Sequence, residues 1–185
     1  MVMALDIETK PWTRADLARL PDDGNRYEVL DGQLLVTPQG SPPHQRIATE
    51  LMLLIGPYLR PTEAAHIVGP GAVPFGDNEL QPDIQVIPGP RRGEKWTDLP
   101  APLLVVEVLS GSTARRELGV KLRAYLDRVL IPTVWLVDHG AREVHVGERG
   151  TPLRVERELL SWHAPGAAEP LRINLPDFFV AALGE

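Results

Sequence analysis

The sequence contains no cysteine, and its 185 residues carry 19 basic against 25 acidic side chains, a formal net charge of -6. Without cysteine the chain forms no disulfide and offers no thiolate to a metal, which is compatible with a reducing cytoplasm. The acidic balance argues against a protein that mainly coats nucleic acid, because such binding depends on Lys and Arg neutralising phosphates. A nucleic-acid enzyme with a local basic rim stays possible, although those basic residues also fit an ordinary solvated surface.

Long apolar runs are also missing. The longest, LMLLIGPYL, covers Leu51 to Leu59 and has about half the length that a membrane helix requires. The first residues, MVMALDIETKPW, show no basic segment followed by an apolar one and so do not predict a secretory signal. With 43% hydrophobic and 24% charged residues, the composition is that of a globular protein, which we expect to be cytoplasmic and free of membranes.

What is present predicts an α+β (or α/β) fold with a central mixed sheet flanked by helices. Asp31-Gly32 lies between two β-rich runs and predicts an N-terminal β-hairpin. A helix is expected to begin after Ser41 and to end before Pro61, and another is expected from Thr113 to Arg128. The strands are expected in AHIVGPGAVPFG, PDIQVIPG, LLVVEVLS, TVWLVD and EVHVGE.

We interpret residues 1–185 as one domain, because no linker or repeat divides them. Residues 1–25 form a helical extension opened by a capping box at Thr13, residues 26–148 the core, and residues 149–185 a C-terminal strand and tail. The apolar tail residues around Trp162 and Phe178 are interpreted as closing the core, with a subunit contact, and hence a homo-oligomer, as the alternative.

The run LLVVEVLS, Leu103 to Ser110, reads as a buried strand but carries a carboxylate, Glu107, in its middle. Burying an ionised carboxylate costs several kcal/mol unless it is paired or binds a cation. Asp83 at the start of a neighbouring strand is one candidate neighbour, and two such carboxylates suit a shared Mg²⁺. Lys121 is the other, since the rise along strand and helix returns it to the level of Glu107.

These residue types are the parts that phosphodiester hydrolysis uses. Each also has a plainer interpretation. Glu107 and Lys121 can form a simple buried ion pair, and Asp83 can simply begin a strand. His44 near the apolar face of its helix can be a structural histidine, and Glu28 an ordinary strand carboxylate.

Five segments together resemble the Uma-two family, which groups bacterial putative restriction-endonuclease-like proteins of the PD-(D/E)XK nuclease superfamily. The segments are RYEVLDGQLLV, SPPHQRIATEL, QPDIQVIP, LLVVEVLSGST and KLRAYLDRVLIPTVWLVD. They occur in the family's order and spacing over residues 26–146. The resemblance implies a restriction-endonuclease-like core.

By this resemblance Asp83 and Glu107 are the acidic residues that bind Mg²⁺ or Mn²⁺, and the carbonyl of Val108 is a further ligand. Leu109 stands where the superfamily usually has its lysine, which implies that Lys121 on the following helix replaces it. Glu28 and His44 are implied to line the same cleft.

The function expected from the resemblance is a metal-dependent nuclease acting on DNA, with Asp83, Glu107 and Lys121 as catalytic residues. Among the basic residues, Arg115 and Arg116 are candidates for phosphate contacts. Two alternatives stay open. One is a non-catalytic protein of the same fold whose acidic and lysine cluster is structural, and the other applies the same chemistry to RNA or another phosphodiester.

Overall fold

The computed structural model describes residues 10–62, 64–89, 93, 95–109 and 114–184, with 114–118 described by their backbone alone. Within these residues the helical elements are α1 (Arg14–Leu17), α2 (Pro42–Leu59), α3 (Ala114–Arg123) and α4 (Leu175–Leu183), with 3-10 turns η1 (Arg60–Thr62) and η2 (Trp96–Asp98) and a π-helix η3 (Ala124–Val129). The strands are β1 (Arg26–Leu30), β2 (Gln33–Thr37), β3 (Ala65–Val68), β4 (Val73–Phe75), β5 (Asn78–Leu80), β6 (Ile84–Pro88), β7 (Leu104–Val108), β8 (Thr133–Asp138), β9 (Glu143–Glu148), β10 (Arg154–Glu156), β11 (Leu159–Trp162) and β12 (Leu171–Asn174).

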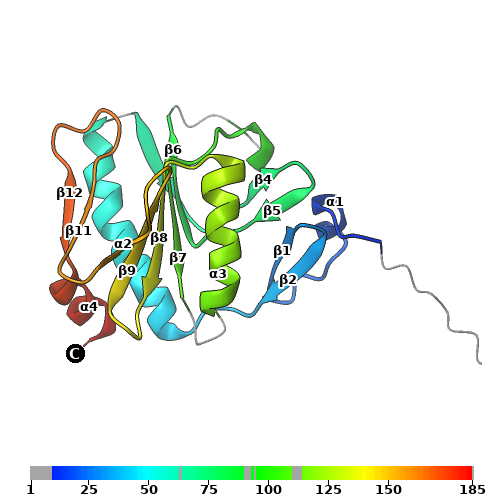
Figure 1. Ribbon diagram of the computed structural model, residues 1–185, viewed down its shortest axis with the longest axis horizontal. Helices are drawn as coiled ribbons and strands as arrows, with labels where there is room; N and C mark the ends of the chain where they lie inside the picture. Colours follow the sequence, from blue (N-terminus) through cyan, green and yellow to red (C-terminus); the bar gives the residue numbers. More distant parts are fainter. Residues whose placement is uncertain (1–9, 63, 90–92, 94, 110–113, 185) are drawn as a thin grey trace, which may run out of the picture.

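A six-stranded mixed sheet in the order β10-β9-β8-β7-β6-β3 forms the centre of the fold (Figure 1). Strands β7 and β8 are parallel and every residue of both is buried, whereas the other neighbours pair antiparallel. A parallel pair needs a crossover between its strands, and α3 with η3 supplies it. The predicted central mixed sheet flanked by helices is therefore confirmed.

The two faces of this sheet carry different layers, as Figure 1 shows. Helices α2 and α4 and the β11-β12 hairpin cover one face, where Leu104, Val106 and Val108 of β7 enter a large apolar core. Helix α3 and η3 cover the other face, where Val105 and Leu109 enter a smaller core around Tyr125. Because side chains alternate along a strand, Glu107 belongs to this second face.

A second sheet, in the order β2-β1-β5-β4, lies beside α3. Asp31 and Gly32 both have positive φ in the turn between β1 and β2, so the hairpin predicted at Asp-Gly is confirmed. The strand run predicted from Ala65 to Gly76, with its glycines and prolines as a break, is two strands in the structure. A break at the glycines and prolines places β3 in the central sheet and β4 in the second one.

The helices predicted from the sequence are observed, with small differences at their ends. Helix α2 has Ser41 as N-cap and Pro42 at its start, and the expected capping box joins Thr13 and Asp16 at α1. The helix predicted from Thr113 is observed from Ala114, and its last six residues widen into the π-helix η3. Thr113 itself lies outside the described residues.

The C-terminal segment is more structured than the predicted strand and tail. It forms β10, the β11-β12 hairpin and α4, with Asn174 accepting a capping hydrogen bond from the backbone of Asp177. Trp162, Phe178 and Phe179 are buried against the large apolar core, as the core-closing interpretation requires. The division of the chain into one domain with extensions stays a prediction, as does the oligomeric state.

Candidate active site

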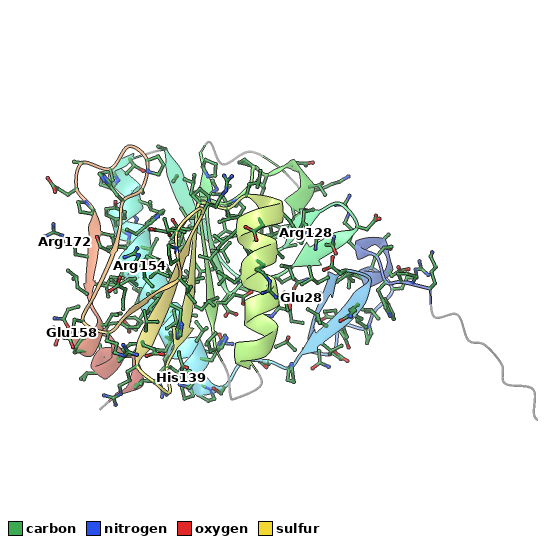
Figure 2. The ribbon with its side chains drawn as sticks, in the orientation of Figure 1. Glu28, Arg128, His139, Arg154, Glu158 and Arg172 are labelled. Atoms are coloured by element: carbon green, nitrogen blue, oxygen red, sulfur yellow. The ribbon has the colours of Figure 1, made fainter. Side chains whose placement is uncertain are left out.

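The structure brings three carboxylates toward one place, Glu28 from β1, Glu107 from β7 and Asp83 from the residue just before β6. Ile84 pairs with Val106 in the antiparallel β6-β7 ladder, and one more step along this register sets Asp83 opposite Glu107. Directly opposite residues have Cβ atoms about 4.5–5.5 Å apart and point to the same face. Glu28 on β1 faces the same place and is fully buried beside α3 (Figure 2).

Asp83 is held by three donors. Its Oδ1 lies 3.0 Å from the guanidinium of Arg26, and its Oδ2 lies 3.1 Å from Nε2 of His44. The backbone N–H of Val108 also donates to Oδ2, at 2.8 Å. Burial alone would raise the pKa of Asp83, but the His44 hydrogen bond, the charge of Arg26 and the Val108 donor together lower it. Asp83 is therefore a carboxylate at neutral pH.

Lys121 reaches from α3 into the cluster. Its Nζ lies 2.8 Å and 2.6 Å from the two oxygens of Glu28 and 3.5 Å from Oε1 of Glu107. The expected contact between Lys121 and Glu107 is thus observed, although Glu28 is the closer partner of Lys121. Burial would lower the pKa of Lys121, and the two carboxylates more than reverse this, so the pKa is raised. Lys121 is a fixed cation.

Glu107 is the least compensated acid. Its Oε1 accepts a hydrogen bond of 2.8 Å from the hydroxyl of Tyr125, and the Glu107 side chain is almost wholly buried. Burial raises its pKa to about 7, and the negative charges of Asp83 and Glu28 add to the effect that Lys121 opposes. Near neutral pH, Glu107 therefore exchanges readily between its neutral and charged forms.

The charges of this cluster do not balance when all three carboxylates are ionised. The carboxylates of Glu28, Asp83 and Glu107 face two permanently charged cations, Arg26 and Lys121. When Glu107 is ionised, one negative charge stays unpaired, and a hard divalent ion would favour this form because carboxylate oxygen is the ligand that such ions prefer. Among the described residues no three Asp, Glu, His or Cys side chains form a ready metal cage. Two carboxylates, Asp83 and Glu107, are what the cluster could offer to Mg²⁺, which usually binds through one or two carboxylates and keeps several waters.

Two residues of the cluster were missed from sequence. Arg26 precedes Glu28 by two positions on β1, so the period of two along a strand places both on one face. Tyr125 follows Lys121 by four positions on the same helical face. Both signals are present in the sequence, but strand and helix periodicity alone assigns neither Arg26 nor Tyr125 to a site.

Some predicted site features stay predictions. The backbone N–H of Val108 contacts Asp83, while metal binding by its carbonyl is not tested. Arg115 and Arg116 belong to the first turns of α3, but their side chains lie outside the described part of the structure.

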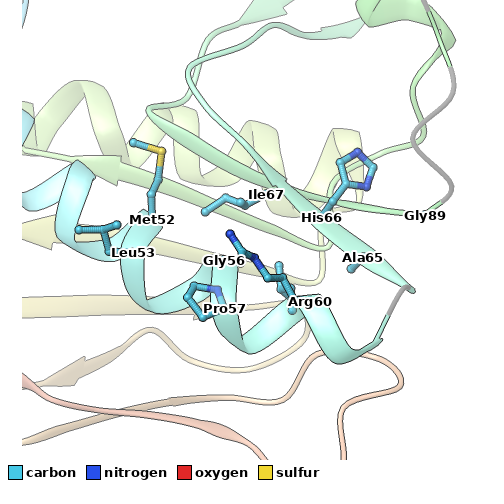
Figure 3. A pocket seen from close by; sticks show the side chains of 10 residues that line it. Met52, Leu53, Gly56, Pro57, Arg60, Ala65, His66, Ile67 and Gly89 are labelled. Atoms are coloured by element: carbon cyan, nitrogen blue, oxygen red, sulfur yellow. The ribbon is translucent and has the colours of Figure 1, made fainter.

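An open pocket of about 400 Å³ adjoins the cluster at Asp83. It is lined by residues 24–26 and 38–40, the first three turns of α2, Pro70, Gln81 and Asp83, and we call it the Asp83 pocket. A larger hollow of about 570 Å³ lies between α2 and β3 (Figure 3). Met52 borders both, but the larger hollow is lined by no Asp or Glu. Of these two hollows, the Asp83 pocket is the one that an acidic residue of the cluster lines.

The fold resembles that of a known nuclease-like structure. A putative nuclease belonging to DUF820 from Anabaena variabilis matches with a TM-score of 0.77 and 22% identity, covering 93% of this chain and 99% of that one. The chain therefore shares the fold of that protein, a central mixed sheet flanked by helices.

The sequence itself places the chain in a family. The model of the Uma2 family, described as "Putative restriction endonuclease", matches residues 14–175, and the chain belongs to this family. An uncharacterized protein from Synechocystis sp. is 28% identical over 130 residues, and the match spans 64% of each chain. No helix among the described residues is long and apolar enough to cross a membrane.

Proposed function

We propose that the protein is a metal-dependent phosphodiesterase that hydrolyses DNA, with Mg²⁺ or Mn²⁺ as its cofactor. The observation that carries this proposal is the charge imbalance of the buried cluster, where three carboxylates face two fixed cations beside an open pocket. An unbalanced buried carboxylate is costly, and Glu107 takes up a proton near neutral pH unless a bound cation holds it in its charged form. Family membership supports the choice of a nuclease reaction.

Asp83 and Glu107 would hold the ion, with the carbonyl of Val108 as a further ligand. A carboxylate has about four lone-pair positions, and three around Asp83 are used by Arg26, His44 and the Val108 N–H, which leaves one. Tyr125 holds Glu107 through Oε1. The bound ion would supply Lewis acidity toward the phosphate and make a coordinated water more acidic.

The protein's own side chains would do the remaining work. Because the pKa of Lys121 is raised, this residue would act as a charged donor toward the phosphoryl oxygens and the attacking water, and not as a base. Glu28 holds the Lys121 ammonium through both carboxylate oxygens and is itself fixed by the backbone N–H of Gln81 at 2.7 Å. Glu28 is therefore a positioning residue, and so is His44, which holds Asp83.

A second candidate function has its own support. Asp83 already accepts from three donors and Lys121 already pairs with two carboxylates, as in a structural ion-pair network. A non-catalytic protein of this fold would keep such a cluster for stability alone. The two candidates differ in one measurable property, which is whether the cluster binds and needs a divalent ion.

The test incubates the purified protein with plasmid DNA, single-stranded DNA and RNA, with Mn²⁺ or with EDTA. We expect cutting of DNA that needs the metal and falls at least about 100-fold in Glu107→Ala and in Lys121→Ala. The matched control is Glu158→Ala, because Glu158 is an exposed acid far from Glu28 in Figure 2 and should leave cutting unchanged.

Each failure points to a different conclusion. Metal-dependent cutting that survives both cluster substitutions would contradict the site assignment. If no substrate is cut and calorimetry detects no Mn²⁺ binding, the structural candidate replaces the enzyme. Preferential cutting of RNA would keep the mechanism and correct the substrate.

A further inference from the structure

We infer that the Asp83 pocket binds one unpaired nucleobase of the substrate, next to the phosphate that is cleaved. This inference rests on the proposed function and adds the class of nucleic acid that the site accepts. The pocket adjoins Asp83 directly and its volume of about 400 Å³ lies in the usual range of ligand pockets, roughly 300–1,000 Å³.

The side chains of the pocket suit a flat, neutral, polar ligand. Gln39 and Gln45 contribute amides that have no side-chain hydrogen bond to any described residue, and each amide offers both donors and an acceptor. Nucleobases present mixed donor and acceptor edges of this kind. Pro38, Ala48 and Met52 supply apolar surface against which the faces of a base could pack.

A free phosphate fits the same pocket poorly. Arg26 is a cation of the pocket, but its charge is paired with Asp83 at 3.0 Å. Helix α2 begins here, and a helix N-terminus usually offers backbone N–H groups to anions. In this helix the first two residues, Pro42 and Pro43, have no N–H, and the N–H of Gln45 is bonded to the Ser41 carbonyl.

The buried side chain of His44 lines the pocket beside Asp83. His44 is buried, its Nε2 contacts Asp83, and its Nδ1 has no hydrogen-bond partner among the described residues. The backbone of Gly40 lies so close that an added Cβ would be 2.4 Å from Nδ1. Gly40 thus closes off Nδ1, and the polar surface open to a ligand here comes from the amides of Gln39 and Gln45.

The base that enters must leave its stack. In a duplex each base is paired and stacked, so placing one in a pocket costs unstacking energy, and the cost is least where the base is already unpaired. We therefore expect single strands, bulges and mismatches to bind better than paired duplex. The net charge of -6 agrees with this, because base contacts supply affinity that does not depend on a wide basic face.

The experiment measures binding in EDTA, so that it does not depend on catalysis. Fluorescence anisotropy compares three labelled DNA oligonucleotides, which are a paired duplex, the same duplex with one extrahelical nucleotide, and the single strand. For the unaltered protein we expect the extrahelical nucleotide to tighten binding by about tenfold or more over the paired duplex. A 2-aminopurine at that position should change its fluorescence on binding.

The variant Gln39→Leu/Gln45→Leu removes both amides at similar side-chain volume and should abolish the preference. Gln33→Leu on β2 is the matched control, because Gln33 is exposed and does not line the pocket, and it should keep the preference. Thermal melting establishes that all three proteins are folded.

Several outcomes would overturn the base pocket. These are equal affinity for the paired and extrahelical duplexes, no binding to any oligonucleotide, and a preference that survives in the double variant. The proposed hydrolysis is judged separately. Preference without metal-dependent cutting supports the pocket and contradicts the nuclease, whereas cutting without preference does the reverse.

Discussion

The two faces of the central sheet are built by the same strands, but only one of them combines its apolar core with a buried charged cluster. On one face Val106 and Val108 of β7 join Trp135 of β8 in an apolar core covered by α2 and α4. On the other, Glu107 stands between Val105 and Leu109, and Asp83 continues the acidic surface across β6. Because side chains alternate between the two faces of a strand, the same strand contributes to an apolar core on one face and to a charged site on the other.

The comparison shows how the charged face stays folded. The apolar face is stabilised because its side chains are removed from water. The buried charged groups of the other face lose hydration, and hydrogen bonds and ion pairs to specific partners must offset this loss. Each carboxylate there has partners from other elements, with Lys121 and Tyr125 from the crossover helix and Arg26 from β1. The stability of this face therefore depends on a few polar atoms at defined distances.

The largest effect is expected from removing the cation that joins the acids. Lys121→Met keeps most of the stem but leaves Glu28 and Glu107 without their ammonium partner. Breaking a buried pair in this way costs about 3–5 kcal/mol in the free energy of unfolding. Urea denaturation at neutral pH measures the change.

Two controls sharpen this result. Lys95→Met removes an exposed lysine and should change the free energy of unfolding by less than about 0.5 kcal/mol. Leu104→Ala on the apolar face should cost about 2–5 kcal/mol, through loss of packing, without altering Mn²⁺ binding. A Lys121→Met protein as stable as Lys95→Met would show that the cluster is not a coupled ion-pair network.

Much of the charged face could be predicted from sequence because its main residues lie on regular elements. The rise along strand and helix predicts that Lys121 reaches Glu107, and Asp83 follows once the two runs are neighbouring strands, in the register that the structure shows. The charge in the middle of the apolar run LLVVEVLS is the local signal that indicates a site at Glu107.

The remainder depends on how separate elements meet, which no local pattern encodes. Glu28 is the nearest partner of Lys121 only because the first hairpin packs beside α3, and nothing within the hairpin sequence gives that position. The second sheet was missed for a related reason. Its strands β4 and β5 have three residues each, too few for a recognisable alternation.

A change of intermediate size in the free energy of unfolding is expected when the pH is varied. This change comes from the charged face, where Glu107 lies. The pKa of Glu107 is raised from its ordinary value of 4.5 to about 7 in the folded protein. Between these values the folded chain holds a proton that the unfolded chain has released. The free energy of unfolding in EDTA should therefore fall as pH rises toward 7, by up to about 1.4 kcal/mol per unit.

Glu107→Gln tests the cause of this slope. The amide keeps the size of the side chain but cannot ionise, so its denaturation curves should lack the part of the slope that Glu107 contributes. A divalent ion favours the charged form, so Mn²⁺ affinity of the unaltered protein should rise with pH, by up to about tenfold per unit below 7. An equal slope in both proteins would contradict the assignment to Glu107.

The smallest effect compares two tyrosine hydroxyls. Tyr125 donates to buried Glu107 and Tyr27 donates to exposed Asp23, both at 2.8 Å. Removing the hydroxyl in Tyr125→Phe leaves a buried carboxylate oxygen short of a donor, which costs about 1–3 kcal/mol. It should also move the pH slope of unfolding to higher pH, because the hydrogen bond favours the charged form of Glu107.

Tyr27→Phe removes a bond of the same length at the surface, where water replaces the hydroxyl. Its cost should stay below about 0.5 kcal/mol, and the pH slope near 7 should not move. Because the two bonds match in chemistry and length, the difference between the variants measures what burial adds to a hydrogen bond on the charged face. Equal losses in the free energy of unfolding, measured by urea denaturation, would mean that water reaches Glu107 as easily as it reaches Asp23. This result would contradict burial as the cause of the raised pKa of Glu107.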